Sequence, residues 1–423
     1  MARFTFAQGN ATKLASLPLY GLGALACLVV PRRRGRWVFG SGTGVGEGAL
    51  PLYRHAQSAD PRLTLTWLAR DGAEVAAAAA QGIRAVRKSS LPGLWATLRA
   101  QVVVVTHGFG DVNRFGVRGA FVVQLWHGIP LKLIHLDSPA TLRTGILSGS
   151  SVVRGMLRRM YAHASAAISL MPAASPVAAG RLRTAFGLPS SRVVVTGDPR
   201  DDVLSRGTAA HRRAIARERL STLLPLHEFR GCRVLLYAPT WRDGERDPGV
   251  PTPAQWPRIA AYLELTDSVL LIRPHPLGVG EYLGGTTAYP RIMLLTPHQL
   301  GDVTPVLPAI DVLITDYSSI AYDFALTDGS VVFLAPDLEE YRRSRGLYQT
   351  YTEFSGGTET DSWDSVLEVL RHSDDDAAFA ARLRTHSARL RASHHEFLDG
   401  RNTERVYKEI CHRLELGRSK VRA

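Results

Sequence analysis

Four short polar turns contain the side chains of this sequence that could transfer a phosphoryl group. Each turn follows an apolar run with the length of a buried strand, so each should lie at the carboxyl end of a strand. Together they supply two histidines, several cations and hydroxyls, the groups that hold a transferring phosphate and accept a nucleophile's proton. The turns are Trp126–Lys132, Tyr237–Asp243, Arg273–Pro276 and Thr315–Ser319.

The turn Thr315–Ser319 runs directly into a predicted helix. The start of that helix presents free backbone N–H groups and a positive dipole end beside the hydroxyls of Ser318 and Ser319. Either of the first two residues of the turn could cap the helix. Asp323, one turn further along the same face, could bind two vicinal hydroxyls of a ribose. The stretch indicates half of a nucleotide-diphosphate site, with an ordinary strand–helix turn as the alternative.

His127 and His275 are the candidate acid–base groups. His127 precedes Gly128, where the backbone can approach a ligand closely, and neutral imidazole is a suitable base for an alcohol. His275 stands between two prolines and follows Arg273, a rigid arrangement suited to an anion. Each histidine alone is more simply explained as a structural residue at a strand end. The four turns taken together favour function.

Three further turns are weaker candidates. Thr106–Gly108 with Asp111 could contact an acceptor, whereas Thr196–Arg200 more simply shapes a linker between domains. Gly40–Gly48 has glycines at a spacing close to that of a dinucleotide loop, but its register is off and it lacks the lysine of a P-loop. We expect a flexible glycine turn near the ligand there.

The composition is that of a folded globular protein, with 45% hydrophobic and 21% charged residues among 423. The net charge of +13 favours an anionic partner such as a membrane surface or a phosphate-rich substrate. The basic residues are spread along the chain without an aromatic-interleaved stripe, which argues against nucleic acid. Three distant cysteines and the lack of a metal-ligand motif predict a reducing compartment, no metal and no cofactor.

Apolar strands alternate with helical patterns in two consecutive series of similar length. Such alternation is typical of βαβ units, so the predicted fold class is α/β with two Rossmann-like doubly wound domains. Ligands of such sheets bind at the carboxyl ends of strands, and we expect the domains to face each other across a cleft. The predicted divisions are a membrane-associating segment (1–36), an N-terminal domain (37–205), a C-terminal domain (206–390) and C-terminal helices (391–423).

The segment Leu14–Val30 is apolar but interrupted by Pro18, Gly21 and Gly23, and the arginine cluster Pro31–Arg36 follows it. A transmembrane helix needs about 20 apolar residues, and a signal peptide needs small residues where the arginines stand. An interfacial anchor fits best, with the apolar segment in the membrane surface and the arginines on anionic headgroups. A spanning helix and an ordinary buried helix are the alternatives.

An ordered set of motifs resembles the CDP-glycerol glycerophosphotransferases of teichoic acid synthesis. The resemblance covers roughly residues 37 to 410, and the ordered set is specific where any single motif is not. The motifs are Gln124–Lys132, Thr196–Arg200 with Asp202, Tyr237–Asp243, Arg273–His275 and Thr315–Ser319, with Asp337–Tyr341 and Asp399–Gly400 as further landmarks.

The resemblance implies a two-domain GT-B architecture and a peripheral, monotopic protein on the cytoplasmic face of a bacterial cell membrane. It implies transfer of glycerol phosphate from CDP-glycerol to a hydroxyl of a lipid-linked acceptor of the undecaprenyl diphosphate type, with release of CMP. His127 would be the base, and His275 would contact the donor pyrophosphate. The other substrate-binding residues implied are Gly128, Lys132, Thr240, Arg242, Arg273, Asp316, Ser318, Ser319 and Asp323.

Other functions remain open from the sequence. Ile129 stands where the family usually has threonine or serine, which removes one hydroxyl near the base and bears on donor or acceptor preference. The main alternative is a ribitol-phosphate transferase or a glycosyltransferase of the same fold with another nucleotide donor. A non-catalytic membrane- or polymer-binding homologue is a second alternative, and a nucleic-acid binder is the weakest. The oligomeric state, a homo-oligomer included, is also open.

Overall fold

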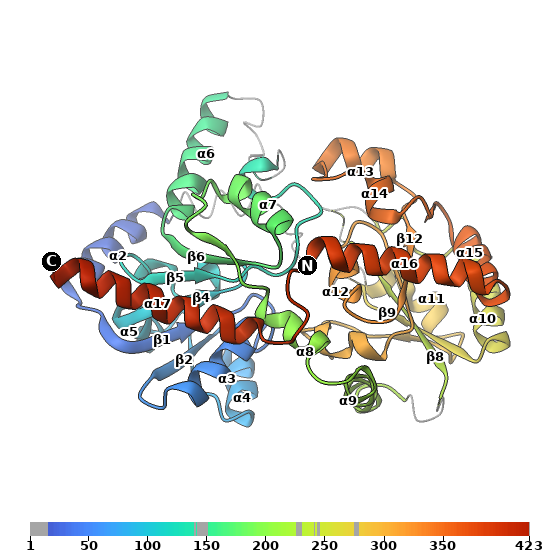
Figure 1. Ribbon diagram of the computed structural model, residues 1–423, viewed down its shortest axis with the longest axis horizontal. Helices are drawn as coiled ribbons and strands as arrows, with labels where there is room; N and C mark the ends of the chain where they lie inside the picture. The colour runs from blue at the N-terminus through green and yellow to red at the C-terminus, as the bar shows by residue number, and fades with distance from the viewer. Residues whose placement is uncertain are drawn as a thin grey trace. The chain divides into compact units, whose positions relative to one another are not determined.

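The computed structural model describes residues 16–138, 141, 151–225, 231–240, 242, 246–274 and 279–422. The chain divides into two compact units, which we call the N-unit and the C-unit (Figure 1). The described part of the N-unit comprises residues up to 128, 134–202 and 395–422, and that of the C-unit comprises 129–133 and 203–394. Each unit is built around one parallel sheet, which confirms the predicted α/β class.

The N-unit sheet has seven strands in the order β3-β2-β1-β4-β5-β6-β7. Its middle strand β4 is a run of valines buried on both faces, as a parallel sheet covered by helices requires. The strands are β1 (Arg33–Phe39), β2 (Thr64–Ala69), β3 (Ala85–Arg87), β4 (Ala100–Val105), β5 (Phe121–Gln124), β6 (Ile168–Ala173) and β7 (Val193–Val195).

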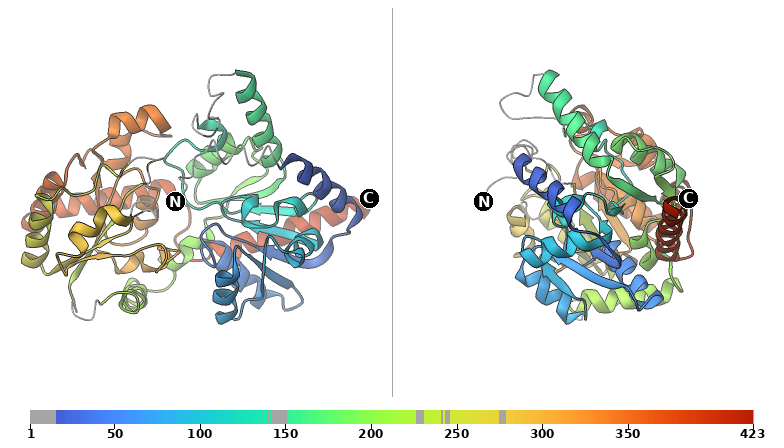
Figure 2. Two further views of the ribbon diagram at one scale, coloured as in Figure 1. Left: turned by 180° about the vertical axis from the view of Figure 1, so that it is seen from behind. Right: turned by 90° about the vertical axis from the view of Figure 1, so that its left-hand side faces the viewer.

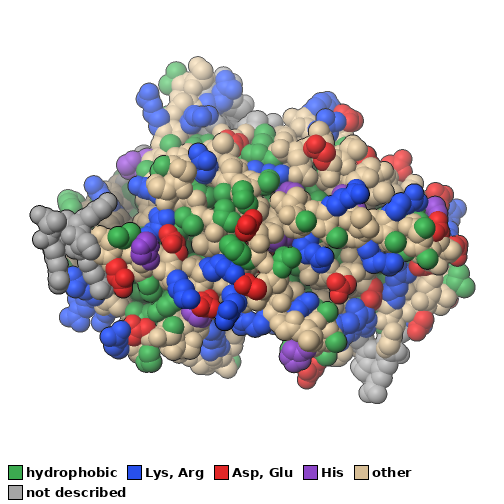
Figure 3. Space-filling model, in the orientation of Figure 1, with side chains coloured by type: hydrophobic (Ala, Val, Ile, Leu, Met, Phe, Trp, Pro, Cys, Tyr) green, Lys and Arg blue, Asp and Glu red, His purple; other side chains and the backbone are tan. Residues whose placement is uncertain are grey.

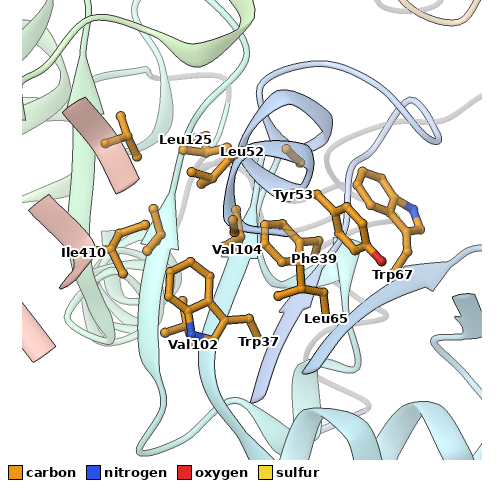
Figure 4. Close-up of a cluster of buried hydrophobic side chains, with 14 of the residues drawn as sticks. Trp37, Phe39, Leu52, Tyr53, Leu65, Trp67, Val102, Val104, Leu125 and Ile410 are labelled. Atoms are coloured by element: carbon orange, nitrogen blue, oxygen red, sulfur yellow. The ribbon is translucent and has the colours of Figure 1, made fainter. Parts of the chain in front are cut away.

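The last helix of the sequence completes the core of the N-unit. Trp37, Phe39 and Trp67 are fully buried, and Val406 and Ile410 of the last helix pack into the same cluster (Figure 4). Burying a side chain of this size contributes about 1.5–3 kcal/mol. The α-helices are α2 (Leu17–Val29), α3 (Ala49–Ala59), α4 (Gly72–Ala80), α5 (Leu91–Arg99), α6 (Ser151–Ser165), α7 (Pro176–Phe186) and α17 (Asn402–Arg422), and the 3-10 turns are η1 (Phe109–Asp111), η2 (Arg114–Gly116), η3 (His135–Asp137) and η4 (Pro199–Asp201).

The C-unit sheet has six strands in the order β10-β9-β8-β11-β12-β13. Strand β11 therefore lies between β8 and β12, so the turns after β8 and β11 are neighbours at one edge of the sheet. The strands are β8 (Arg233–Ala238), β9 (Ser268–Ile272), β10 (Ile292–Leu294), β11 (Val312–Thr315), β12 (Ser330–Leu334) and β13 (Glu359–Thr360).

Helices cover this sheet and continue to residue 394. Helix α15 begins at a Ser362 cap and buries Trp363, Val366 and Leu370 against the sheet. The helices are α8 (Asp202–Ser205), α9 (Ala209–Ser221), α10 (Gln255–Leu265), α11 (Leu283–Thr286), α12 (Ile320–Phe324), α13 (Leu338–Arg345), α14 (Tyr351–Ser355), α15 (Trp363–Asp375) and α16 (Ala377–His394), with η6 (Val279–Tyr282) and η7 (Thr304–Ala309).

The segment Ile129–Leu133, which directly follows the Trp-His-Gly turn, belongs to the C-unit. Lys132 forms an antiparallel bridge with Leu347. The Leu133 N–H donates to the Gly346 carbonyl at 3.1 Å, and the Tyr348 N–H donates to the Leu131 carbonyl at 2.9 Å. Lys132 therefore lies in a different unit from its sequence neighbour His127.

The predicted apolar segment forms the helix α2. Its Tyr20 ring packs edge-on against Phe115 of η2 at 5.1 Å, and Gly23 lets the helix approach the Phe115 carbonyl closely. Figure 2 shows α2, in dark blue, at the surface of its unit. Among the described helices, none combines the length and the apolar composition needed to cross a membrane.

Candidate functional site

The Trp126-His127-Gly128 turn at the end of β5 has an unusual backbone. Trp126 has a φ of +66° and Gly128 a φ of +142°. A bulky residue in the left-handed region is strained, and strain of this kind concentrates at functional sites. The turn is held by packing of Trp126 against Phe186 at 5.1 Å and by Arg200, whose Nη1 donates to the His127 carbonyl at 2.8 Å. The N-unit therefore fixes the predicted base His127 in a defined place.

A second histidine lies flat against His127. The rings of His107 and His127 are parallel within 5°, and their centroids are 4.1 Å apart. His107 follows β4, the neighbour of β5 in the sheet, so the predicted acceptor turn Thr106–Gly108 does lie beside the predicted base. Glu47 lies 3.5 Å from the His107 Nδ1 atom. We call Glu47, His107 and His127 the histidine cluster.

The turn Thr196–Arg200, expected to shape a linker, also contacts the base turn. The Arg200 guanidinium lies 3.4 Å from Asp198 and 3.7 Å from Asp201, and it reaches the His127 carbonyl between them. Arg200 is buried, so its contact with the turn is shielded from water. Sequence reasoning missed this role, because nothing in the sequence says that β5 and the segment after β7 end side by side.

The C-unit holds a cluster of ion pairs around the buried side chain of Arg242. Arg242 Nη1 donates to Asp316 at 2.9 Å, and its Nε and Nη2 donate to Asp337 at 2.7 and 2.9 Å. Its guanidinium also lies over the rings of Tyr317 and Tyr341. Burial lowers the pKa of Arg242, but the hydrogen bonds and charges of Asp337 and Asp316 outweigh that effect and raise it above its ordinary value. We call Arg242, Asp316 and Asp337 the carboxylate–arginine cluster.

Asp316 joins two turns rather than capping a helix. Both of its carboxylate oxygens accept the Thr240 N–H, at 2.8 and 3.0 Å, and one also accepts the Tyr317 N–H at 2.6 Å. Thr315 donates to the Ala238 carbonyl instead. The expectation that Thr315 or Asp316 caps α12 is therefore wrong, because Thr315 binds the last residue of β8 and Asp316 binds the turn that follows it. The spacing of residues along the chain indicated the helix that follows the turn, but it could not indicate that β8 lies beside β11.

The hydroxyls predicted to bind phosphate lie beside this cluster. Thr240 is buried, and its Oγ1 atom has no hydrogen-bond partner among the residues the structure describes. Ser318 and Ser319 are partly exposed at the start of α12, and the Ile320 N–H donates to the Ser318 hydroxyl at 3.4 Å. Asp323 is only 4% exposed, so its contact with a ribose remains a prediction.

Lys132 and Arg273, two cations of the C-unit that are predicted to bind substrate, have different surroundings. Burial lowers the pKa of Lys132 to about 8, against the opposing charge of Asp316. Arg273 donates to the carbonyls of Leu300 and Gly301 at 2.8 and 2.9 Å, and burial lowers its pKa to about 10. Arg273 thus holds the loop after β10, whereas Lys132 lies in the electrostatic field of the carboxylate–arginine cluster.

Some predicted residues cannot be placed. His275, Trp241 and Asp243 lie outside the described residues. Within the described part of the chain, no group of three or more His, Cys, Asp or Glu side chains is arranged to hold a metal ion. The structure therefore brings His127 and Gly128 together in the N-unit, and Lys132, Thr240, Arg242 and Asp316 together in the C-unit.

The characterised proteins that match this chain include teichoic acid polymerases and transferases. The teichoic acid ribitol-phosphate polymerase TarK of Staphylococcus aureus is 29% identical over 232 residues, which are 54% of this chain and 42% of that protein. The teichoic acid glycerol-phosphate transferase of the same species is 27% identical over 267 residues, which are 60% of this chain and 62% of that protein. The chain thus spans about half the length of these relatives.

A solved structure of the wall teichoic acid polymerase TagF superposes with a TM-score of 0.73 at 19% identity, over 97% of this chain and 98% of that chain. A TagF variant soaked with CDPG superposes with a TM-score of 0.74. At this identity the likeness shows a shared fold. The family described as CDP-glycerol:poly(glycerophosphate) glycerophosphotransferase matches residues 26–412, nearly the whole chain. On that match, the chain belongs to the CDP-glycerol:poly(glycerophosphate) glycerophosphotransferase family.

Proposed function

We propose that this protein transfers glycerol phosphate from CDP-glycerol to a hydroxyl of a lipid-linked acceptor in the synthesis of a teichoic acid or related cell-wall polymer. The family match over residues 26–412 carries the proposal. The reaction needs the base of the N-unit and the anion-binding groups of the C-unit in one catalytic cycle.

His127 is the base in this proposal. It takes the proton of the acceptor hydroxyl, whose oxygen attacks the phosphorus that bears the glycerol. The bond from that phosphorus to the bridging oxygen breaks, and CMP leaves with the electron pair. The rigid turn with positive φ at Trp126 and Gly128 keeps the imidazole in place, so little reorganisation is needed when the substrate binds.

The donor diphosphate is assigned to the C-unit. Lys132, the Thr240 hydroxyl and the hydroxyls of Ser318 and Ser319 are the groups that would bind it, together with His275 from the family resemblance. Arg242 supports them indirectly, because Asp316 and Asp337 already occupy its donors. Asp316 in turn fixes Thr240 through the backbone.

CDP-ribitol is the second candidate donor. The relatives include ribitol-phosphate polymerases and glycerol-phosphate transferases at similar identity, 29% and 27%. Nucleic acid gains no support as a partner: on the face shown in Figure 3, Lys and Arg side chains are interspersed with acidic ones rather than gathered in a stripe.

Peripheral binding to the cytoplasmic face of a membrane is part of the proposal. Leu22 and Leu28 of α2 are 64% and 74% exposed, and Leu19 and Leu25 are exposed as well. Leu91 and Trp95 of α5 add further exposed apolar surface, and both helices pack against η2. Exposed apolar side chains beside cations are typical of an interfacial helix.

The arginines after α2 divide between two roles. Arg33 and Arg34 are exposed and free to face anionic headgroups. Arg32 instead donates to the carbonyls of Thr97 and Ala100 at 3.0 and 2.7 Å, and burial lowers its pKa. Arg32, which follows α2 in the sequence, thus holds the end of that helix against the segment around α5.

The test of the chemistry is release of CMP by the purified protein from CDP-glycerol and CDP-ribitol, with synthetic lipid-linked acceptors. We expect CMP and a glycerophosphate-extended lipid from CDP-glycerol, and loss of both in His127→Ala. The variant His55→Phe is a matched control, because His55 packs against Tyr407 in the same unit, away from the base turn. Turnover with CDP-ribitol but not with CDP-glycerol would show that CDP-ribitol is the donor. Normal turnover in His127→Ala would show that His127 is not the base.

The test of membrane binding is co-flotation with vesicles that contain anionic lipid. We expect Leu22→Gln with Leu25→Gln to weaken flotation while the circular dichroism spectrum stays unchanged. Ile215→Gln is the control, because Ile215 is 50% exposed on α9 of the C-unit. Wild-type protein that does not float, or a double variant that floats equally well, would contradict this role of α2.

A further inference from the structure

His107 is a second imidazole at the site that the proposed mechanism does not use. Its ring lies parallel to that of His127 with a centroid separation of 4.1 Å. Strands β4 and β5 pair in register, with Val105 opposite Gln124, so the two histidines leave neighbouring strands at the same edge of the sheet. The contact is therefore built into the central strand pairing of the N-unit.

The surroundings hold His107 from several sides. The Asp111 carboxylate accepts the N–H groups of Thr106, His107 and Gly108 at 2.9, 2.7 and 3.3 Å, which closes the turn. The Thr106 hydroxyl lies 2.9 Å from the His107 Nδ1 atom. A Cβ atom on Gly42 would come within 2.6 Å of the His107 ring, so only glycine lets that loop lie over the imidazole.

Glu47 places a buried negative charge behind His107. It is 8% exposed, has a φ of +52°, and accepts a hydrogen bond from the Ser41 hydroxyl at 2.7 Å. Its carboxylate lies 3.5 Å from the His107 Nδ1 atom. The His107 ring thus contacts both the Glu47 carboxylate and the ring of the proposed base, His127.

We infer that His107 is a positioning residue for His127 and that, with Glu47 behind it, it stabilises the imidazolium form of the base. The inference rests on the proposed function, in which His127 takes a proton. A cation on the base ring is attracted to a carboxylate in a partly buried site, and the polar nitrogens of the His107 ring lie between the two groups. The Asp111 carboxylate also faces this turn, and Arg200, paired with Asp198, contacts the His127 carbonyl from the other side.

Two variants separate this role from simple packing. His107→Phe keeps a flat ring on His127 but removes the nitrogens, and Glu47→Gln keeps the acceptor for Ser41 but removes the charge. For each we expect kcat to fall about tenfold, a small part of a general-base contribution, with the KM for CDP-glycerol unchanged within about twofold. Because the imidazolium loses a stabilising neighbour, the acidic limb of the kcat/KM profile should move to lower pH by about half a unit to one unit.

The experiment uses the full chain, with folding of each variant confirmed by urea denaturation and with His55→Phe as the control for histidine replacement. Wild-type kcat and an unshifted profile in either folded variant would overturn the inference. If His127→Ala is inactive while His107→Phe and Glu47→Gln behave as wild type, the inference fails and the proposed function stands. If His127→Ala retains full turnover, the base assignment fails and the inference fails with it.

Discussion

The histidine cluster of the N-unit and the carboxylate–arginine cluster of the C-unit both lie at the carboxyl ends of a parallel sheet, but their charges are arranged differently. In the C-unit, one guanidinium forms hydrogen bonds to two carboxylates at 2.7 to 2.9 Å. In the N-unit, two imidazoles stack with centroids 4.1 Å apart, and the nearest carboxylate of the cluster lies 3.5 Å from a ring nitrogen of His107.

This difference distinguishes residues that hold a turn in place from residues that could take part in the reaction. A buried charge that already has its partners stabilises a turn, and it has few donors left for a ligand. An imidazole whose environment fixes its position but not its charge can act as a base. Of the cations predicted to bind substrate, Arg242 and Arg273 therefore belong to the supporting structure, and Lys132 is the one of the three whose pKa, about 8, lies closest to neutral pH.

The largest expected effect is on turnover in the histidine cluster. His127→Ala should lower kcat by about 10²–10⁴, the range for loss of a general base. The free energy of unfolding should change by no more than about 1 kcal/mol, because the side chain is partly exposed although its ring stacks on His107. Parallel CMP-release kinetics and urea denaturation of one protein preparation check both values. A loss of stability that matches the loss of activity would place His127 among the supporting residues.

The carboxylate–arginine cluster should respond in the opposite way. Arg242→Met leaves the buried carboxylate of Asp316 and the partly exposed carboxylate of Asp337 without their cation. It should cost about 3–5 kcal/mol in the free energy of unfolding. Arg258→Met removes an ion pair to Asp364 whose side chains are 62% and 41% exposed, and it should cost no more than about 1 kcal/mol. Equilibrium denaturation of the two variants gives the comparison. Equal costs would show that burial does not matter to the Arg242 pairs.

Much of this arrangement could be predicted from the sequence. The strands that precede the turns of the two clusters, such as β4 and β11, are apolar runs buried on both faces. Runs of this kind can be recognised in the sequence alone. Helix α13 was not predicted, because Tyr341 is its one buried residue and no apolar period exists. Helix α15 was overlooked although it carries the signal: a serine cap and buried apolar residues at helical spacing.

The pairings within the clusters could not be predicted. Glu47 and His107 meet because β1 and β4 are adjacent, and Arg242 meets Asp316 because β8 and β11 are adjacent. Strand order is a property of the folded sheet, and residue spacing does not contain it. The sequence thus indicated the candidate turns, and the order of the strands in each sheet decides which of their side chains contact one another.

Lys132 gives a smaller effect that depends on pH. Its pKa in the folded protein is lowered to about 8 by burial, so the lysine is charged below that pH and neutral above it. Affinity for CDP-glycerol, measured by calorimetry with His127→Ala, should therefore fall by up to about tenfold per pH unit above pH 8. Lys132→Arg should remove this dependence, because an arginine stays charged. A flat profile in the parent protein would mean that Lys132 does not face the donor.

The same lowered pKa has a defined consequence for stability. In the unfolded chain the lysine titrates near its ordinary value of 10.5. Between about pH 8 and 10.5 the unfolded state holds more protons than the folded state, so stability should rise with pH across this window. In Lys132→Met, the free energy of unfolding measured with urea should no longer rise with pH across this window. If a carboxylate partner instead stabilised the charged lysine, the parent protein would lose stability as the pH rises.

The smallest expected effect on function concerns Ile129, where the family resemblance predicts a hydroxyl. Ile129 is 4% exposed and belongs to the C-unit, although it follows the base turn by only two residues. Ile129→Thr would bury a hydroxyl in place of apolar atoms, and it should cost about 1–3 kcal/mol in the free energy of unfolding. Ile215→Thr, at an exposed position of the same unit, should cost less than about 0.5 kcal/mol. Because Ile129 belongs to the C-unit and the proposed base to the N-unit, kcat should stay within about twofold at temperatures where both variants are folded. An increase in kcat with either CDP-linked donor would instead show that the hydroxyl acts in the reaction, and the division between supporting and chemical residues would then have to include this position.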